Sequence, residues 1–139
     1  MPPIEYLSRS PGLGLPNGPY DFRKEIVEST VLSRRAGNYS IGYTPPMGAG
    51  FVPKIVGGSD EDLQQELLQQ LDIAARKGYD KFVFKYVNSP EERFEHECLN
   101  YHSFQRQLDN KQHPQPPAGT KLSCPDRVCE LFFQHTNDK

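Results

Sequence analysis

Cysteine and histidine are the residue types in this chain whose spacing could bind a metal ion. Cys98 and His102 are four residues apart, so on a helix they would share one face. Cys124 and Cys129 follow in a proline-rich segment and are five residues apart. Three thiolates and one imidazole would form a closed tetrahedral Cys₃His site, which is an arrangement that structural Zn²⁺ prefers.

Two alternatives to this zinc site stay open. His113 lies in the same proline-rich segment and could replace His102 as the imidazole ligand. Alternatively, no metal is bound, Cys98 is a small buried apolar residue, and the other two cysteines are thiols. The chain has three cysteines, an odd number that does not suit a disulfide-bonded scaffold. We therefore expect a reducing, intracellular setting, namely the cytoplasm.

The helix that would carry the first Cys/His pair has clear sequence signals. Ser89 can cap it, Pro90 suits the first helical position, and Glu92 stands three residues after the serine. These signals predict a helix that runs to about Phe104. It follows the range 79–87, in which aromatic residues alternate with valine and lysine, and this alternation predicts a strand.

A second strand and helix are expected earlier in the chain. The run Phe51–Val56 ends at two glycines, and Ser59 or Asp60 could cap the leucine-striped helix that follows. This pattern predicts a strand, a tight glycine turn and a helix that ends at about Gly78. Pro53 indicates that the strand lies at a sheet edge or contains a bulge.

These elements predict an α+β fold. Residues 36–43 alternate like a half-buried strand, which gives the order β-β-α-β-α and a small three-stranded antiparallel sheet flanked by helices. We assign 1–20 to an extended Pro/Gly-rich arm, 21–110 to the α+β domain and 111–139 to a Pro-rich tail. Residues 21–35 suit a short helix or a strand.

Composition excludes some function classes. With 139 residues the chain is long enough for one ordinary core, and its net charge of -2 gives no overall basic field for nucleic acid. No apolar run approaches the roughly 18 residues of a membrane span, so we expect no membrane partner. The 13 prolines and 11 glycines indicate that part of the chain lies outside the packed core.

The order of these motifs resembles the GIY-YIG endonuclease domain, from about Ala36 to Asn110. Residues 37–39, Gly-Asn-Tyr, stand where the first motif belongs, and residues 55–57, Ile-Val-Gly, where the second does. Within that family the chain is similar to small uncharacterised proteins, through three further stretches at 59–63, 97–102 and 108–110.

The resemblance implies phosphodiester hydrolysis with one divalent metal ion, Mg²⁺ or Mn²⁺. Tyr39 matches the tyrosine that helps to activate the attacking water, Glu97 matches the metal-binding glutamate, and Asn110 matches a later asparagine. From the residues alone, other interpretations hold: Tyr39 as a core aromatic, Glu97 as a helix-surface charge, and Asn110 as a turn residue.

Two positions depart from the family pattern. Ile55 replaces the second tyrosine, and Glu66, or Gln65 under a gap-free alignment, stands where a helix arginine is expected. Loss of one such cationic contact typically costs about 3–4 kcal/mol, or roughly 10²–10³ in rate. We therefore expect a nuclease-like domain that is catalytically impaired and that binds a nucleic acid or a protein partner.

Two other functions remain alternatives. An active endonuclease could use a relocated arginine, for which Arg34, Arg76 and Arg93 are candidates. A purely structural or interaction module would need no catalytic group. If the family assignment holds, the side chains of Tyr39 and Glu97 should lie on one face, together with Glu66.

Overall fold

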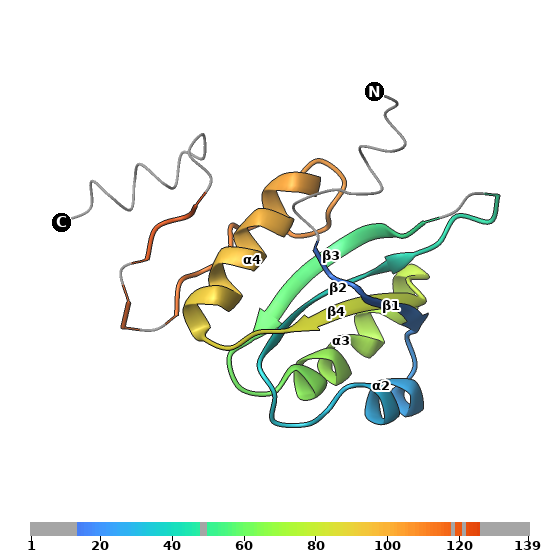
Figure 1. The fold of residues 1–139 in the computed structure, drawn as a ribbon. Helices are drawn as coiled ribbons and strands as arrows, with labels where there is room; N and C mark the ends of the chain where they lie inside the picture. Colours follow the sequence, from blue (N-terminus) through green and yellow to red (C-terminus); the bar gives the residue numbers. More distant parts are fainter. Residues whose placement is uncertain (1–13, 48–49, 118, 121, 126–139) are drawn as a thin grey trace.

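The protein contains a four-stranded antiparallel sheet and three helices within the residues that the structure describes. The computed structural model describes residues 14–47, 50–117, 119–120 and 122–125. In chain order the elements are β1 (Asn17–Asp21), α2 (Lys24–Thr30), β2 (Gly37–Tyr43), β3 (Val52–Ser59), α3 (Leu63–Lys77), β4 (Lys81–Tyr86) and α4 (Pro90–Phe104). The strand order is β1-β4-β2-β3 (Figure 1). The expected α+β class is confirmed.

The strand β1 corrects the prediction of three strands and of an extended arm up to residue 20. It pairs antiparallel with β4, and the side-chain Nδ2 of Asn17 donates to the carbonyl oxygen of Phe84 at 3.1 Å. The ring of Tyr20 lies 5.7 Å from the ring of Phe82. Glycine and proline inside β1 hide its strand character in the sequence, and pairing with the aromatic strand β4 stabilises it.

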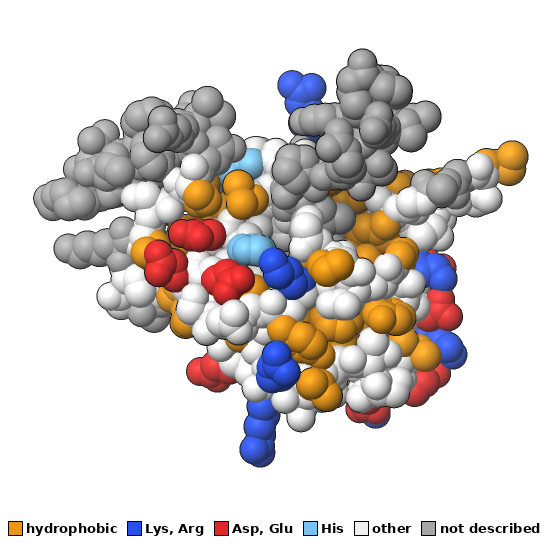
Figure 2. Space-filling view, in the orientation of Figure 1, with side chains coloured by type: hydrophobic (Ala, Val, Ile, Leu, Met, Phe, Trp, Pro, Cys, Tyr) orange, Lys and Arg blue, Asp and Glu red, His pale blue; other side chains and the backbone are white. Residues whose placement is uncertain are grey.

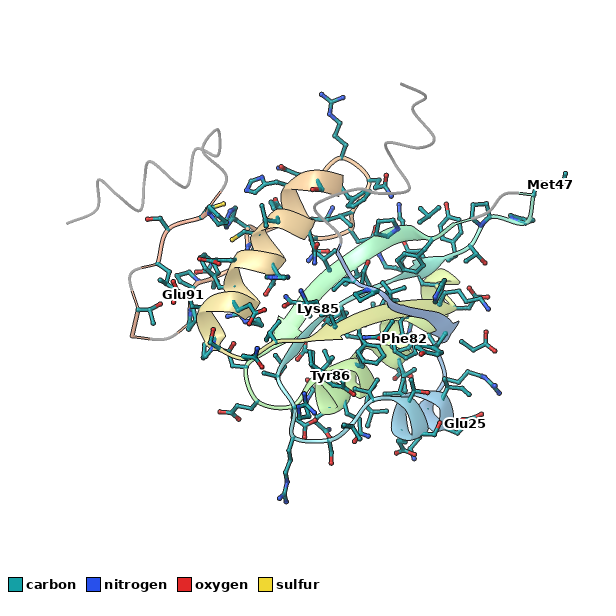
Figure 3. The ribbon with its side chains drawn as sticks, in the orientation of Figure 1. Glu25, Met47, Phe82, Lys85, Tyr86 and Glu91 are labelled. Carbon is teal, nitrogen blue, oxygen red and sulfur yellow. The ribbon has the colours of Figure 1, made fainter. Side chains whose placement is uncertain are left out.

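One face of the sheet packs on α2 and α3. Alternate residues of β2 and β4 point to this face, as the strand period requires. Figure 3 shows two of them, Phe82 and Tyr86, on β4. The fully buried members of this core include Val27, Ile41, Leu63, Leu67 and Phe82. The leucines on one stripe of α3 therefore do what their spacing predicts.

The other face of the sheet packs on α4. The buried side chain of Asn38 in β2 donates from Nδ2 to the carbonyl oxygen of Arg93 in α4, at 3.0 Å. Tyr39, the next residue in β2, belongs to the core on the α3 side. Consecutive residues of β2 thus reach the two helices from opposite faces of the sheet.

The strand β3 lies at the edge of the sheet, as Pro53 indicates. The pairing of β2 with β3 shifts register between Ile41 and Gly42, next to Pro53, so the strand also contains an irregularity at the expected place. Sequence reasoning is wrong about the two glycines, however. Gly57 and Gly58 are strand residues that pair with Tyr39 and Asn38, and β3 continues to Ser59.

The ends of the helices follow local chemistry. Asp62 caps α3 by accepting the N–H of Gln65 at 3.1 Å, so the predicted cap at Ser59 or Asp60 is wrong. Gly78 ends α3 in the left-handed conformation with φ 78°, and Ser89 caps α4 by accepting the N–H of Glu92 at 3.0 Å. Both of these ends agree with the sequence prediction. Among the described helices, none has the length and apolar character needed to cross a membrane.

Candidate functional site

Tyr39 and Glu66 form the first part of the site. The Oη of Tyr39 donates a hydrogen bond to Oε2 of Glu66 at 3.1 Å. The two side chains come from β2 and from the first turn of α3. Gly57, the partner of Tyr39 in β3, makes this contact possible, because a Cβ there would lie 2.5 Å from the Tyr39 Oη. A glycine is needed here for space and not for a left-handed backbone.

The Tyr39 hydroxyl is a hydrogen-bond donor and not a base at neutral pH. Burial raises its pKa well above the ordinary value, and the negative charge of Glu66 and the hydrogen bond to it raise the pKa further. The charge of Glu97 acts in the same direction. The phenol therefore stays protonated, and its proton is directed at a carboxylate of the protein.

Arg93 on α4 forms the second part of the site. Its Nε donates to Oδ1 of Asp60 at 2.7 Å, and its Nη1 pairs with Oε1 of Glu97, one helical turn further along. The side chain of Arg93 is 9% exposed, and its Cδ would lie 2.7 Å from a Cβ at position 58, where the chain has glycine. Both glycines of β3 therefore leave room for site residues, one on each face.

The charge of Glu97 is only partly compensated by Arg93. Burial raises the pKa of the Glu97 carboxyl to about 7. The charge of Arg93 and its hydrogen bond oppose this shift, while the charges of Glu66 and Asp60 add to it. Burial lowers the pKa of Arg93, but its two carboxylate partners raise it by more, so the guanidinium stays charged. The Glu97 carboxyl can therefore gain or lose a proton near neutral pH.

Asn110 holds the chain after α4 against the free edge of β3. Its Oδ1 accepts the N–H of Val56 at 2.9 Å, and its Nδ2 donates to the carbonyl oxygen of Val56, also at 2.9 Å. The N–H of the preceding residue, Asp109, donates to the carbonyl oxygen of Lys54 at 2.6 Å. The side chain of Asn110 therefore extends the sheet like a strand residue and covers its edge.

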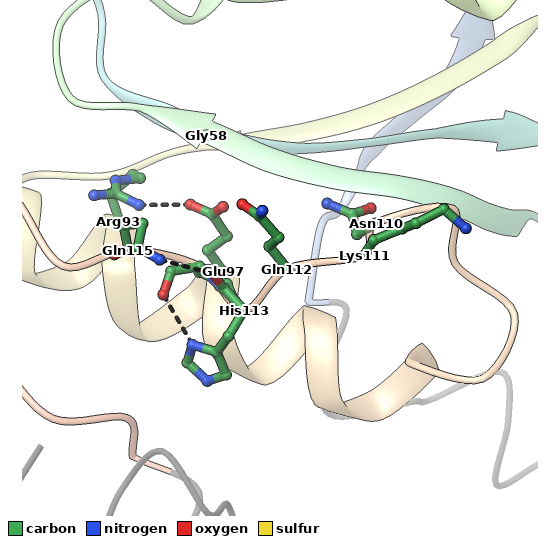
Figure 4. A pocket seen from close by; sticks show the side chains of 9 residues that line it. Gly58, Arg93, Glu97, Asn110, Lys111, Gln112, His113 and Gln115 are labelled. Atoms are coloured by element: carbon green, nitrogen blue, oxygen red, sulfur yellow. Dashed lines mark hydrogen bonds and ion pairs between the residues drawn. The ribbon is translucent and has the colours of Figure 1, made fainter. Parts of the chain in front are cut away.

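An open cavity of about 580 Å³ lies beside these groups. Its walls are Gly58 of β3, Arg93 and Glu97 of α4, and the segment 110–115 (Figure 4). The segment contributes polar side chains, including Lys111. A ligand in this cavity would meet Glu97 and Arg93 as an ion pair, together with a lysine and side-chain amides.

The predicted site residues meet around the edge strand and not on one face. Tyr39 and Glu66 lie on the α3 face of the sheet, whereas Glu97 comes from α4 on the opposite face. The charge of Glu97 still raises the pKa of Tyr39, and that of Glu66 raises the pKa of Glu97. The three side chains therefore interact through their charges, across the edge strand β3. Among the described residues, no further strand pairs with β3 on that edge.

The Cys/His residues form a cluster between α4 and the segment that follows it. Cys98, His113 and Cys124 each offer one ligand atom, and these atoms all lie within 4.8 Å of one another, so the group could hold a metal ion. His102 adjoins it, because its Nε2 is 3.1 Å from Nε2 of His113. Cys129, the remaining ligand of the predicted Cys₃His set, lies outside the described residues.

Sequence reasoning named Arg93 as a candidate arginine but missed its ion pair with Glu97 and the burial of Asn100. The four-residue spacing of Arg93 and Glu97 on one helix is a signal that could have revealed their ion pair. Asn100, one turn after Glu97, is 1% exposed, and neither side-chain atom has a hydrogen-bond partner among the described residues. No local pattern marks this asparagine as buried.

Comparisons of the chain with known protein families, with curated proteins and with solved structures found no match. The visible face in Figure 2 carries acidic and basic side chains that are interspersed. The expectation that Tyr39 and Glu97 share one face is wrong, and their placement on opposite faces of the sheet counts against the GIY-YIG assignment, which rests on the sequence resemblance alone.

Proposed function

We propose that this chain is a GIY-YIG nuclease-like domain that is catalytically impaired and that binds a nucleic acid or a protein partner through the cavity beside Glu97. Two observations support the impairment. The guanidinium of Arg93 is already engaged by two carboxylates, and Glu66 occupies the place beside Tyr39 where the family resemblance expects an arginine.

The electrostatics explain why cleavage should be poor. Three carboxylates contact the Tyr39 hydroxyl or the Arg93 guanidinium, and they belong to Asp60, Glu66 and Glu97. A phosphate that approached them would meet mainly like charge, which reverses the stabilisation that a preorganised arginine provides. Arg93 could contact that phosphate only by giving up Asp60 or Glu97.

The donor atoms separate two classes of metal ion. Glu97 offers carboxylate oxygen, which suits Mg²⁺ or Mn²⁺, and a raised pKa fits a carboxylate whose charge a cation would compensate. Bound there, such an ion would supply Lewis-acid chemistry toward a phosphate. The thiol and imidazole donors of Cys98, His113 and Cys124 suit Zn²⁺ instead, and we propose zinc for that group.

The partner is tested by binding of fluorescently labelled DNA to the full chain, measured by anisotropy. We expect binding that weakens as salt rises, because Lys111 is a cation at the cavity. Lys111→Glu should weaken it clearly. Lys24→Glu, which changes an exposed lysine on α2 that pairs with Glu28, is the matched control and should not. Equal affinity of the two variants would contradict binding through the cavity.

The runner-up is an active endonuclease in which Arg93 serves as the relocated arginine. The observation that favours it is the position of Arg93 beside Glu97 in the wall of the cavity. In that case Arg93→Lys would abolish cleavage, because lysine cannot replace the planar, forked guanidinium at a phosphate. A purely structural or interaction module is the third candidate, and the excess of carboxylates around Arg93 suits it.

A further inference from the structure

The Cys/His cluster joins α4 to a part of the chain that lies well beyond it. Cys98 is in α4, whereas His113 and Cys124 come from the segment after the helix. Both cysteines are fully buried, in a small core with Phe94 and Leu122 that is separate from the main core. Apolar surroundings of this kind shield metal–sulfur bonds from water.

His102 adjoins this group of three through His113. It is four residues after Cys98 on α4, so the two side chains project from the same face of the helix. Zinc–nitrogen bonds of about 2.0–2.1 Å in a tetrahedron place two nitrogen ligands about 3.3 Å apart. The distance between Nε2 of His102 and Nε2 of His113 is 3.1 Å, which is close to that tetrahedral edge.

The environment of His113 orients it as a ligand. Its Nδ1 lies 2.8 Å from the carbonyl oxygen of Pro114. A carbonyl can only accept, so Nδ1 carries a proton, and a neutral ring would then present the lone pair of Nε2 to the cluster. A backbone carbonyl in this role is a common support for a metal-bound histidine. The ring of Tyr101 packs edge-on against both imidazoles and holds them in place.

We infer that Cys98, His102, His113 and Cys124 form a closed Cys₂His₂ zinc centre that fastens the segment after α4 to that helix. Two thiolates balance the charge of Zn²⁺, so the centre is neutral and suits a buried place. This set differs from the Cys₃His set expected from the sequence, because His113 takes the position of Cys129.

The centre also shapes the cavity. The segment 110–115 is held at Asn110 by two hydrogen bonds to Val56, and zinc would hold it again at His113. Lys111 lies between these two attachment points and lines the cavity. The inference extends the zinc assignment made above, while its test does not depend on binding or cleavage of nucleic acid.

The test is metal analysis of the full chain, purified under reducing conditions without added chelator. We expect about one zinc per chain, and loss of nearly all of it in His113→Ala and in Cys124→Ser. Cys129→Ser should keep its zinc, and so should His96→Ala, a control on the same helix outside the cluster. If Cys129→Ser lost its zinc and His113→Ala kept it, the proposed ligand set would be overturned.

A second measurement needs no variant and so does not depend on whether variants fold. X-ray absorption at the zinc edge of the wild-type protein should show two sulfur ligands at about 2.3 Å and two nitrogen ligands at about 2.0–2.1 Å. Three sulfurs would overturn the Cys₂His₂ set but leave the zinc assignment standing. No zinc after addition of the metal to reduced protein would overturn both, and neither result would bear on the nuclease-like site.

Discussion

At the scale of single residues, the state of Glu97 and Arg93 determines what the cavity can bind. The two side chains form a largely buried ion pair, and burial of such a pair is costly because both groups lose water. Arg93 recovers part of this cost through Asp60, its second carboxylate partner. Arg93 is the one cation among the described residues that shift the pKa of Glu97. The negative charges of Glu66 and Asp60 disfavour the charged form of Glu97.

The raised pKa of Glu97 predicts that the charged carboxylate destabilises the folded protein. Below about pH 4.5 Glu97 is protonated in both states, and its neutral form costs nothing extra. As pH rises through about 7, the folded protein must lose this proton, so stability falls over the interval. Glu97→Gln stays neutral, so its free energy of unfolding should exceed that of the wild type by an amount that grows between these pH values.

The pKa shift of Glu97 sets the size of this difference in the free energy of unfolding. A change in pKa from 4.5 to about 7 corresponds to roughly 3 kcal/mol at pH 8 and above. Denaturant unfolding at a series of pH values measures it. Glu95→Gln, an exposed carboxylate on the same helix, is the control and should follow the wild type. Parallel curves for wild type and Glu97→Gln would contradict the burial of this charge.

At the scale of elements, β3 is the part of the fold that brings the site together. Its two glycines leave space on opposite faces of the sheet, for Tyr39 on one side and Arg93 on the other. Its free edge is covered by the segment that carries Asn110. The sequence indicates a turn at these glycines, because glycine pairs often mark turns, and only the pairing with β2 shows that they serve close packing.

The role of Gly57 can be tested by one methyl group. Gly57→Ala would place a Cβ 2.5 Å from the Tyr39 hydroxyl, so the tyrosine ring must move, which disturbs its hydrogen bond to Glu66. We expect a loss of about 1–3 kcal/mol in the free energy of unfolding, as for other overpacked sites. Tyr39→Phe removes the nearest clashing atom, so the double variant should lose less than the sum of the single losses. Additive losses would show that Gly57 does not act through Tyr39.

At the scale of the whole molecule, local sequence signals predicted several helix ends, whereas long-range contacts determine the strand β1 and the Cys/His cluster. The cap at Ser89 and the stop at Gly78 are encoded within a few residues, and both were predictable. The strand β1 was not, because its stability comes from pairing with β4, which lies more than sixty residues later. The meeting of His113 with Cys98 depends likewise on how the segment after α4 folds back.

We propose that the site resembles a nuclease site that lacks its catalytic charge. Such a site would bind a partner without cleaving it, since Arg93 is held between two carboxylates and Glu66 faces Tyr39. Replacement of Glu66 by arginine would restore a cation beside the Tyr39 hydroxyl. If the resemblance holds, Glu66→Arg should therefore gain cleavage that the wild type lacks.

The most direct test is nicking of supercoiled plasmid DNA by the purified protein with Mg²⁺ or Mn²⁺, followed on agarose gels. The loss of one cationic contact alone typically lowers a rate by roughly 10²–10³, so we expect little nicking by the wild type and no further decrease in Glu97→Ala. Robust nicking by the wild type that disappears in Glu97→Ala and in Arg93→Lys would contradict the impaired site and establish the active enzyme in its place.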